Sequence, residues 1–376
     1  MAGGWAVGSE TETREQIKRR FLAEAGLADA AREPLPMDAS TRSYERLRRA
    51  DGSTLMLMDA PRTAEGAPCP PDATDAERAA RGWNALARLA ASRVEAFVAC
   101  AAYLRGRGLS APQVIALDTP NGLAVIEDLG EALFARLIEQ GADAGPFYET
   151  AIDILVDLHA EAPPASLPVG DGTQWPLLTY DALALQSGAD LFPQWWPKLE
   201  GGAFAPDALA EWAALWAPIT AAGERGASVF IHRDYHAENL LWLPERQGLA
   251  RVGLLDFQDA LKGHPAWDLL SLLQDARREV PAELELAMLT RYLAARPELD
   301  GDAFLADYAG LAALNASRIL GIFARLVVRD GKPKYLAFLP RMKRMLARNL
   351  EQPSMEPLKA WFTEHAPGIW VQGEPE

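Results

Sequence analysis

The sequence is poor in cysteine, and it lacks both a long apolar run and an excess of positive charge. Cys69 and Cys100 are the only cysteines in 376 residues, and they form no CxxC pair. This pattern excludes a disulfide framework and a zinc site of ordinary spacing, and it suits a reducing compartment. No apolar run reaches about 18 residues, and residues 1–8 lack the basic start of a signal peptide. We therefore expect a cytoplasmic protein without a membrane partner.

Positively charged residues are fewer than negatively charged residues in this chain. Lys and Arg number 37 against 52 Asp and Glu, which gives a formal net charge of −15. Such an acidic surface repels polyanions, so we expect no nucleic-acid partner. A nucleotide site remains compatible with this charge, because local side chains and a divalent metal reverse the potential. The composition, 49% apolar and 24% charged, is typical of a globular protein, and the length predicts two domains or two lobes.

The first third of the chain mixes helical and extended patterns. Helical patterning begins near Thr13 and returns over about residues 75–105. Four extended runs form two hairpins: 43–48 with 54–58, and 113–116 with 123–126. Residues 1–127 are therefore predicted to form a small α+β lobe with an antiparallel sheet.

Residues 128–376 have mainly helical patterning. A stretch rich in Pro and Trp, residues 162–197, interrupts it and predicts irregular structure. Three short apolar runs are further exceptions: 229–231, 240–243 and 252–255. We expect these runs to be short strands within a helical lobe.

Two polar clusters follow such strands and carry the chemistry. Residues 229–231 run into a His-Arg-Asp sequence ending at Asp234, Asn239 follows five residues later, and 252–255 run into Asp256-Phe257. This spacing is typical of kinases, in which an aspartate serves as the base while an amide and a carboxylate hold Mg²⁺. A hairpin between the Asn239 and Asp256 segments would let both side chains bind one ion, which prefers oxygen ligands. The sequence thus predicts Asp234 as catalytic base and Asn239 and Asp256 as metal ligands.

Each piece of this pattern also has an ordinary structural explanation. An aspartate at a strand end commonly caps a turn, and a neighbouring histidine commonly bonds a carbonyl. The conjunction in order, each group at the end of a predicted strand, favours kinase chemistry over separate turns.

These residues resemble the aminoglycoside phosphotransferase superfamily, the small-molecule branch of the protein-kinase-like fold. The resemblance covers roughly residues 13–352. Several stretches are more closely similar to bacterial anomeric amino-sugar kinases: 38–44, 57–61, 125–130, 255–260, 321–326 and 329–333. Asp-Phe-Gln-Asp-Ala at 256–260 and Arg-Asp-Gly-Lys-Pro at 329–333 are the more specific signals. The resemblance implies an α+β bilobal fold, with a small antiparallel-sheet lobe at 1–127 that binds nucleotide and a mainly helical lobe at 128–376.

The activity that the resemblance implies is ATP-dependent phosphorylation of an N-acetylated amino sugar. The acceptor would be the anomeric hydroxyl of N-acetylmuramate or N-acetylglucosamine, and the product the α-1-phosphate, in cell-wall recycling. ATP and Mg²⁺ would be the cofactors, the only partner a small amino sugar, and the chain a monomer.

The resemblance also implies roles for individual residues. The turn Ser40-Thr41-Arg42 would lie over the ATP phosphates, where its hydroxyls, N–H groups and guanidinium can bind oxygen atoms; a solvated turn is the alternative. Glu127, Asp128 and Leu129 would form the hinge whose backbone binds adenine. Asp268 would accept backbone N–H groups of the catalytic loop, and His232 would organise that loop without acting as acid or base.

One departure from kinase-like folds concerns the strand lysine that pairs with the α- and β-phosphates. The strand at 54–59 has no Lys or Arg, and Met58 takes that place. Either Arg42 supplies the missing positive charge, or nucleotide affinity is modest.

The acceptor pocket is less clearly marked. Tyr235, His236, Gln258 and Asp259 are candidates because they lie near the reacting centre along the chain. Asp181 and Trp195 belong to a stretch whose aromatic and acidic composition suits sugars, although core packing explains its tryptophans equally well. A carboxylate on N-acetylmuramate would call for a base such as Arg318 or Arg325, either of which could instead form a surface salt bridge.

Two other functions remain open from the sequence. One is a kinase of the same fold that acts on aminoglycosides, choline or homoserine. The other is a nucleotide-binding pseudokinase scaffold, suggested by the absent strand lysine.

Overall fold

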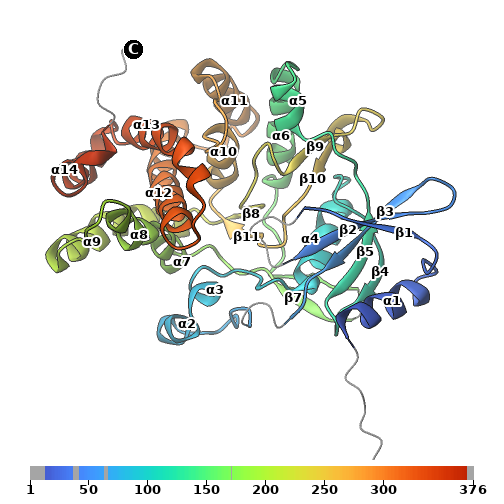
Figure 1. Ribbon diagram of the computed structural model, residues 1–376. Coiled ribbons are helices and arrows are strands. Elements are labelled where there is room, and N and C mark those ends of the chain that lie inside the picture. Colours follow the sequence, from blue (N-terminus) through green and yellow to red (C-terminus); the bar gives the residue numbers. More distant parts are fainter. Residues whose placement is uncertain (1–12, 37–41, 63–66, 171, 371–376) are drawn as a thin grey trace, which may run out of the picture.

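The computed structural model describes residues 13–36, 42–62, 67–170 and 172–370, which form two lobes. The N-terminal lobe is built on a five-stranded antiparallel sheet, and helices dominate the other lobe (Figure 1). The nucleotide-binding turn predicted at Ser40 and Thr41 lies outside the described residues, and only its last residue, Arg42, is described.

The N-terminal sheet has the order β1-β2-β3-β5-β4, and each pair of neighbours is antiparallel. Its strands are β1 (Ala31–Pro34), β2 (Ser43–Arg48), β3 (Thr54–Asp59), β4 (Val114–Asp118) and β5 (Leu123–Glu127). Both predicted hairpins are confirmed. Strand β1 was missed, because a four-residue edge strand that ends in proline has no clear alternation.

Strand β3 presents different side chains to the two faces of this sheet. Leu55 and Leu57 pack with Phe21 and Leu22 of α1 (Arg14–Glu24), which covers the outer face. Met56 and Met58 join the large core on the inner face, toward the second lobe. This alternation of side chains along β3 separates a small outer core from the core that lies behind the active site.

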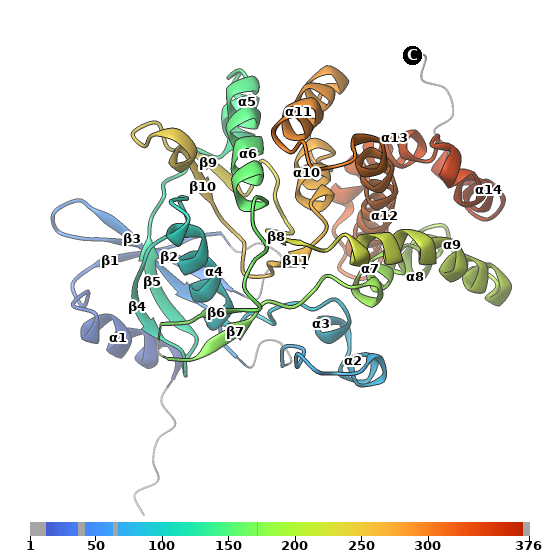
Figure 2. The same cartoon turned by 180° about the vertical axis from the view of Figure 1, so that it is seen from behind.

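The helical pattern predicted over 75–105 is broken into three helices: α2 (Asp75–Arg81), α3 (Trp83–Leu86) and α4 (Val94–Gly106). Gly82 ends α2 with φ of 89°, and Arg88, Ala91 and Ser92 also have positive φ. Such angles are incompatible with a continuous right-handed helix. Helix α4 stays against the sheet, whereas α2 and α3 lie beside α7 of the other lobe (Figures 1 and 2).

The second lobe contains most of the helices. They are α5 (Phe134–Glu139), α6 (Gly145–Leu158), α7 (Ala182–Ala189), α8 (Leu191–Leu199), α9 (Pro206–Arg225), α10 (Ala266–Leu273), α11 (Ala282–Ala295), α12 (Gly301–Val328), α13 (Leu339–Asn349) and α14 (Glu356–His365). Short 3₁₀ turns occupy Gly248–Arg251, Pro333–Phe338, Pro353–Met355 and Pro367–Ile369. The prediction of irregular structure over 162–197 was wrong for its second half. There, Asp181 caps α7 by accepting a bond from the Ala184 N–H, and Pro193 lies in the first turn of α8, where proline is tolerated.

Helix α12 is the central helix of this lobe. It is long and apolar enough to cross a membrane, but 67% of its most apolar window is buried inside the protein. It packs very closely on α8, since a Cβ added to Gly321 would come within 2.5 Å of the Leu191 backbone. The packing identifies α12 as a core helix that holds α8 in place.

Three two-stranded ribbons complete the second lobe. Strands β9 (Leu240–Trp242) and β10 (Val252–Leu254) form the predicted hairpin, and β8 (Val229–Ile231) pairs with β11 (Leu261–Gly263). A third ribbon joins β6 (Ser166–Pro168) to β7 (Gln174–Pro176). The first two ribbons place the polar clusters that follow β8 and β10 next to each other.

Candidate active site

A buried carboxylate fixes the start of the loop that follows β8. Asp268, near the start of α10, accepts the N–H groups of His232 at 2.6 Å and of Arg233 at 2.8 Å. The indole N–H of Trp267 donates to the Arg233 carbonyl at 3.1 Å, so this loop is held although Arg233 has φ of 81°. Burial raises the pKa of Asp268 to about 7, against the lowering effect of these two N–H bonds. The bonds are those predicted for Asp268.

The loop and the β9–β10 hairpin bring Asp234, Asn239 and Asp256 to one place. The Asn239 side-chain amide donates to the Asp234 carbonyl at 2.9 Å, and the Leu255 N–H donates to the Asn239 carbonyl at 2.9 Å. Asp256 follows directly with φ of 61°, a left-handed conformation that turns its side chain out of the strand. Asn239 and Asp256 then line the same cavities between the lobes. The side chains of Asn239 and Asp256 therefore share a cavity, and the backbone of Asp234 is bonded to Asn239 beside them.

Positive groups surround the half-buried carboxylate of Asp234. Burial alone would raise its pKa, but the positive charges of Arg318 of α12 and of Arg233 outweigh this effect and hold the pKa below its ordinary value. His232 is itself buried between Tyr235 and Phe257, and burial lowers its pKa to about 4, so it is neutral. Asp234 is thus ionised at neutral pH and able to accept a proton or a hydrogen bond.

The donor set at Asn239 and Asp256 suits a hard cation such as Mg²⁺. Within the described ranges, no three His, Cys, Asp or Glu side chains gather to hold a metal. A metal held by Asn239 and Asp256 alone would therefore take its other ligands from phosphate and water, as Mg²⁺ commonly does. A cation already meets Asp256 in the structure, because Arg42 donates to its Oδ1 at 2.7 Å.

An apolar cavity of about 300 Å³ opens next to this pair, between the lobes. Its walls come from β1–β3, α4, the connection after β5, and the end of β10. The apolar wall residues are Leu35, Tyr44, Met56, Phe97, Pro112, Ile126, Leu129 and Leu255, and the polar ones are Arg42, Arg46, Glu127, Asp128, Asn239 and Asp256. A flat apolar slot that ends at a carboxylate and an amide fits a purine base with its phosphates directed toward Asp256.

The predicted hinge lies on the wall of this cavity. The Glu127 carboxylate is bonded by Arg246 at 2.6 Å, and Asp128 accepts the Arg46 guanidinium at 2.8 Å and the Gly130 N–H at 2.9 Å. These side chains are occupied by the protein itself. The contribution of the hinge to a base would therefore come from its backbone, as predicted.

The described part of β3 carries no cationic side chain on its inner face. Met58 is fully buried there, and Met56 reaches the cavity. Arg42 enters the same cavity from the chain before β2 and is the cation beside Asp256. Of the two alternatives left by the sequence, this position favours Arg42 as the substitute for the strand lysine.

The acceptor candidates are not all placed as predicted. Tyr235 was wrong as a substrate residue, because its ring is fully buried and its hydroxyl donates to the Ala151 carbonyl at 2.9 Å. His236 lines a cavity together with Asn239 and Asp256, and its Nε2 lies 3.4 Å from the Asn239 amide nitrogen.

Asp181 lies in a buried network of charges. Its carboxylate is bonded by Arg78 at 2.7 and 3.0 Å and by Arg88 at 2.8 Å. These arginines come from the α2–α3 segment, so the network ties that segment to α7. A carboxylate so fully engaged positions the wall of a pocket and is not available to a sugar hydroxyl, which corrects the prediction that Asp181 binds substrate directly.

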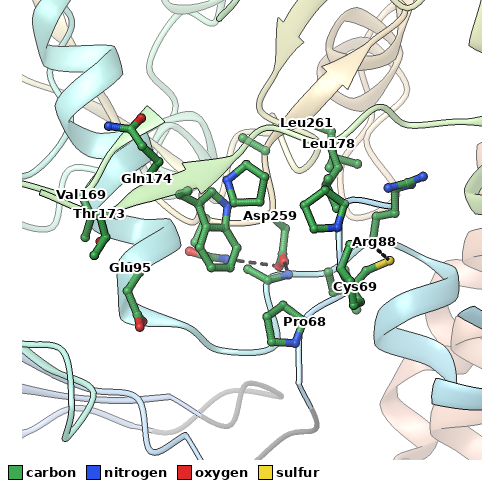
Figure 3. Close-up of a pocket in the computed structure, with 18 residues that line it drawn as sticks. Pro68, Cys69, Arg88, Glu95, Val169, Thr173, Gln174, Leu178, Asp259 and Leu261 are labelled. Atoms are coloured by element: carbon green, nitrogen blue, oxygen red, sulfur yellow. Dashed lines mark hydrogen bonds between the residues drawn. The ribbon is translucent and has the colours of Figure 1, made fainter. Parts of the chain in front are cut away.

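Gln258 and Asp259 border a second cavity, of about 380 Å³ (Figure 3). Gln258 donates to Asp256 Oδ1 at 3.0 Å, and the buried Asp259 accepts the Ala90 N–H at 2.6 Å. Figure 3 shows Asp259 reaching into the middle of this cavity, while the guanidinium of Arg88 points away from it. Burial raises the pKa of Asp259 despite the opposing effect of Arg233. Gln258 is thus bonded directly to Asp256, and Asp259 follows Gln258 in the same turn.

Sequence reasoning missed most walls of the nucleotide cavity and the arginines of the α2–α3 segment. Met56 could have been found from the alternation of β3, which places it on the same face as Met58. Arg78 and Arg88 gave no signal, because they meet Asp181 only after about a hundred residues of intervening chain have folded.

Comparison with known proteins agrees with this geometry. Residues 31–305 match the phosphotransferase enzyme family. The chain is 59% identical over 354 residues to the N-acetylmuramate/N-acetylglucosamine kinase of Caulobacter vibrioides, covering 94% of this chain and 97% of that protein. A protein of the same name from Pseudomonas aeruginosa is 30% identical over 327 residues, covering 83% and 82% of the two chains.

Solved structures share the fold at low sequence identity. Plasmodium vivax ethanolamine kinase superposes with a TM-score of 0.54 at 10% identity, covering 93% of both chains. The ADP-bound aminoglycoside phosphotransferase APH(2'')-Ib gives a TM-score of 0.51 at 12% identity, covering 91% of this chain and 98% of its own. The predicted bilobal kinase-like fold is confirmed, and the chain is a kinase that belongs to the phosphotransferase enzyme family.

Proposed function

We propose that this kinase transfers the γ-phosphoryl group of ATP to the anomeric hydroxyl of N-acetylmuramate or N-acetylglucosamine, giving the α-1-phosphate. The observation that supports the proposal is the shared cavity of Asn239 and Asp256, with Asp234 bonded to Asn239 through its backbone carbonyl, in a chain 59% identical to a kinase named for these two sugars. The product and the cofactor suggest a cytoplasmic role in recycling cell-wall amino sugars.

The nucleotide would bind in the apolar cavity beside the hinge. Its base would lie between Met56 and Leu255, and its phosphates would extend to Asp256. Asn239 and Asp256 would hold Mg²⁺, which neutralises charge on the transferring phosphoryl group. Arg42 would exchange its bond to Asp256 for bonds to phosphate oxygens, since guanidinium binds both groups well.

Asp234 would act on the acceptor. Its carboxylate is ionised and half-buried, and the nearby positive groups stabilise that ionised form. It would orient the anomeric hydroxyl and take its proton as the oxygen–phosphorus bond forms and the bond to the leaving ADP breaks. The aldose hydroxyl is more acidic than an ordinary alcohol, so a carboxylate of lowered pKa is an adequate base.

The acceptor would occupy the side of Asp234 opposite the nucleotide. Asp259 and Gln258 flank this side from the second cavity, and Arg318 of α12 flanks it from the helical lobe. Burial raises the pKa of Asp259. Its carboxyl group would form a hydrogen bond with a sugar hydroxyl. The Arg78–Asp181–Arg88 network would hold this wall in position without touching the sugar.

An acceptor panel with product analysis tests the proposal. Purified enzyme with Mg·ATP is offered N-acetylmuramate, N-acetylglucosamine, an aminoglycoside, choline and homoserine, while ADP release is measured. We expect turnover on the two sugars. In the NMR spectrum of the product, the anomeric proton should couple to phosphorus, and its coupling to H2 should be small, as in an α-linkage. Turnover on kanamycin or choline without turnover on either sugar would contradict the proposal. Binding of Mg·ATP without ADP release on any acceptor would instead indicate a pseudokinase.

A further inference from the structure

Three arginines follow one face of α12 and its C-cap, and the proposed reaction uses only the first of them, Arg318. Arg318, Arg325 and Arg329 follow the spacing i, i+7 and i+11, so they share one stripe of the helix. The aliphatic stem of Arg318 lies against α7, where a Cβ on Gly188 would be 3.2 Å from its Cδ. The row therefore runs along the contact between α12 and the α7–α8 pair.

Within the described ranges, the first two arginines of this row are not bonded to a carboxylate, although Arg318 lies near Asp234 and Arg325 near Asp330. Among the residues that the structure describes, neither Arg318 nor Arg325 forms an ion pair, and Arg318 donates only to the Asn315 carboxamide at 3.0 Å. The Nε of Arg325 is buried and has no hydrogen-bond partner in the described parts of the chain. Asp330 acts electrostatically on Arg325, but its carboxylate is bonded to Arg329 at 2.6 and 3.0 Å.

The positive charges of the row reinforce one another. Burial is the main effect that lowers the pKa of Arg325; Arg329 and Arg318 lower it further and Asp330 opposes them, so Arg325 is a partly desolvated cation with positive neighbours. Arginine remains protonated in proteins, so the result is a local positive potential on a chain of net charge −15. Such an arrangement is unfavourable unless an anion joins it.

The row connects the catalytic aspartate to an open cavity. Arg318 is close enough to Asp234 to be the main positive group that lowers its pKa. Arg325, about 10 Å further along the helix, lines a cavity of about 500 Å³ together with Ser187, Gln194 and Trp195. Asp190 also lines this cavity, but its carboxylate accepts from Gln186 and Trp212, and burial raises its pKa. An anion in the cavity would therefore meet Arg325 and Arg329, while the Asp190 carboxylate is held by its own hydrogen bonds to Gln186 and Trp212.

We infer that Arg318 and Arg325 bind the carboxylate of the acceptor and so determine how well the enzyme uses N-acetylmuramate relative to N-acetylglucosamine. This inference rests on the proposed function. The two sugars differ by the lactyl ether on O3 of N-acetylmuramate, whose carboxylate is its only charge. With the anomeric hydroxyl at Asp234, a substituent two ring carbons away extends from Asp234 along the arginine row. Guanidinium binds carboxylate in a directed, bidentate manner, which is why arginine and not lysine suits this place.

The test compares the two sugars on the same enzyme preparation. The ratio of kcat/KM for N-acetylmuramate to kcat/KM for N-acetylglucosamine is measured for wild type, Arg318→Gln, Arg325→Gln and the double variant. A charge-assisted hydrogen bond to carboxylate corresponds to about a 10- to 100-fold change in this ratio. We expect each single variant to lower it about 10-fold and Arg325→Lys to lower it less. The matched control is Arg291→Gln on α11, an exposed arginine bonded to Asp153, which should leave the ratio unchanged.

A second measurement needs no variant. The methyl ester of N-acetylmuramate keeps the lactyl group but loses its charge. For wild type, kcat/KM should therefore be at least about 10-fold lower for the ester than for the acid. An unchanged ratio in both arginine variants overturns the inference. Equal use of the ester and the acid by wild type also overturns it, and so does wild-type activity on N-acetylglucosamine alone. Wild type inactive on both sugars would contradict the proposed function itself, which keeps the two failures distinct.

Discussion

The two sides of the cleft are built in different ways. The side that we propose for the nucleotide is a largely apolar cavity whose walls come mostly from strands and the hinge, and its charged residues are Arg42, Arg46, Glu127, Asp128 and Asp256. The acceptor side is assembled from arginines and carboxylates that are far apart in the sequence, such as Arg78 with Asp181 and Arg318 beside Asp234. Kinases of this fold act on different acceptors, as the names of an ethanolamine kinase and an aminoglycoside phosphotransferase show, so we expect the variable chemistry to lie at the long-range charge network.

Substitution of Asp256, the proposed metal ligand between the two sides of the cleft, should lower kcat/KM the most. Asp256→Asn keeps one oxygen but removes the charge that would hold Mg²⁺ and receive Arg42. We expect kcat/KM to fall about 10³-fold with either sugar, because metal stabilisation of the transferring group contributes several kcal/mol. Initial rates of ADP release measure this. Asp153→Asn, which changes an exposed ion pair on α6, is the control, and a loss below tenfold would argue against Asp256 as a ligand.

Breaking the buried network should affect the acceptor side alone. Arg78→Met leaves the Asp181 carboxylate with one arginine fewer in a buried place, so we expect unfolding by urea to require about 3 kcal/mol less. The KM for sugar should rise while ADP affinity stays unchanged. Arg81→Met, an exposed arginine in the same helix, is the matched control. Equal losses of sugar and nucleotide affinity would show that the two sides are not separable in this way.

Acid should destabilise the helical lobe first, because all five histidines lie after residue 128. Burial lowers the pKa of His159 to about 3, and this histidine is bonded to the Tyr292 hydroxyl at 2.8 Å. The unfolded chain therefore takes up a proton below pH 6.5 that the folded chain refuses, and stability falls as pH drops from 6.5 toward 3. The loss from this residue should reach about 2 kcal/mol at pH 5. In urea titrations at pH 8 and pH 5, His159→Gln should show a smaller difference than wild type; an equal difference would exclude His159 as the cause.

The smallest of these effects concerns the nucleotide side. Arg42→Met removes the cation that we place on the phosphates, and the KM for ATP should rise about 10-fold while the KM for sugar stays constant. Arg42→Lys should recover part of the loss, since a point charge replaces a fork of donors. An unaltered KM for ATP in Arg42→Met would leave the missing strand lysine without a substitute.

The sequence predicted the elements that carry Asn239 and Asp256 better than the surroundings of the acceptor candidates, for a physical reason. Hairpins, the β8 loop and the β9–β10 turn depend on neighbours within a few residues, so their patterns place Asn239 and Asp256 correctly. Tyr235 lies next to Asp234 in the chain, yet its backbone turns the ring into the core, which chain position cannot reveal.

Elements that depend on distant contacts were the ones misjudged. Residues 75–105 have the composition of one helix, but Gly82 and the positive φ angles near Arg88 break it so that α2 and α3 reach α7. Helix α8 contains two prolines, so the sequence did not predict it as a helix. Its packing on Gly321 of α12 stabilises it. Tertiary packing overrides local pattern in both cases.

The account depends most directly on Asp234 as the group that acts on the acceptor hydroxyl. The decisive measurement is single-turnover phosphorylation of N-acetylglucosamine by Asp234→Asn at saturating Mg·ATP, with ADP affinity measured on the same protein. We predict a rate lower by about 10²- to 10⁴-fold with unchanged ADP affinity, as expected for loss of a general base. A rate close to that of wild type would contradict the account.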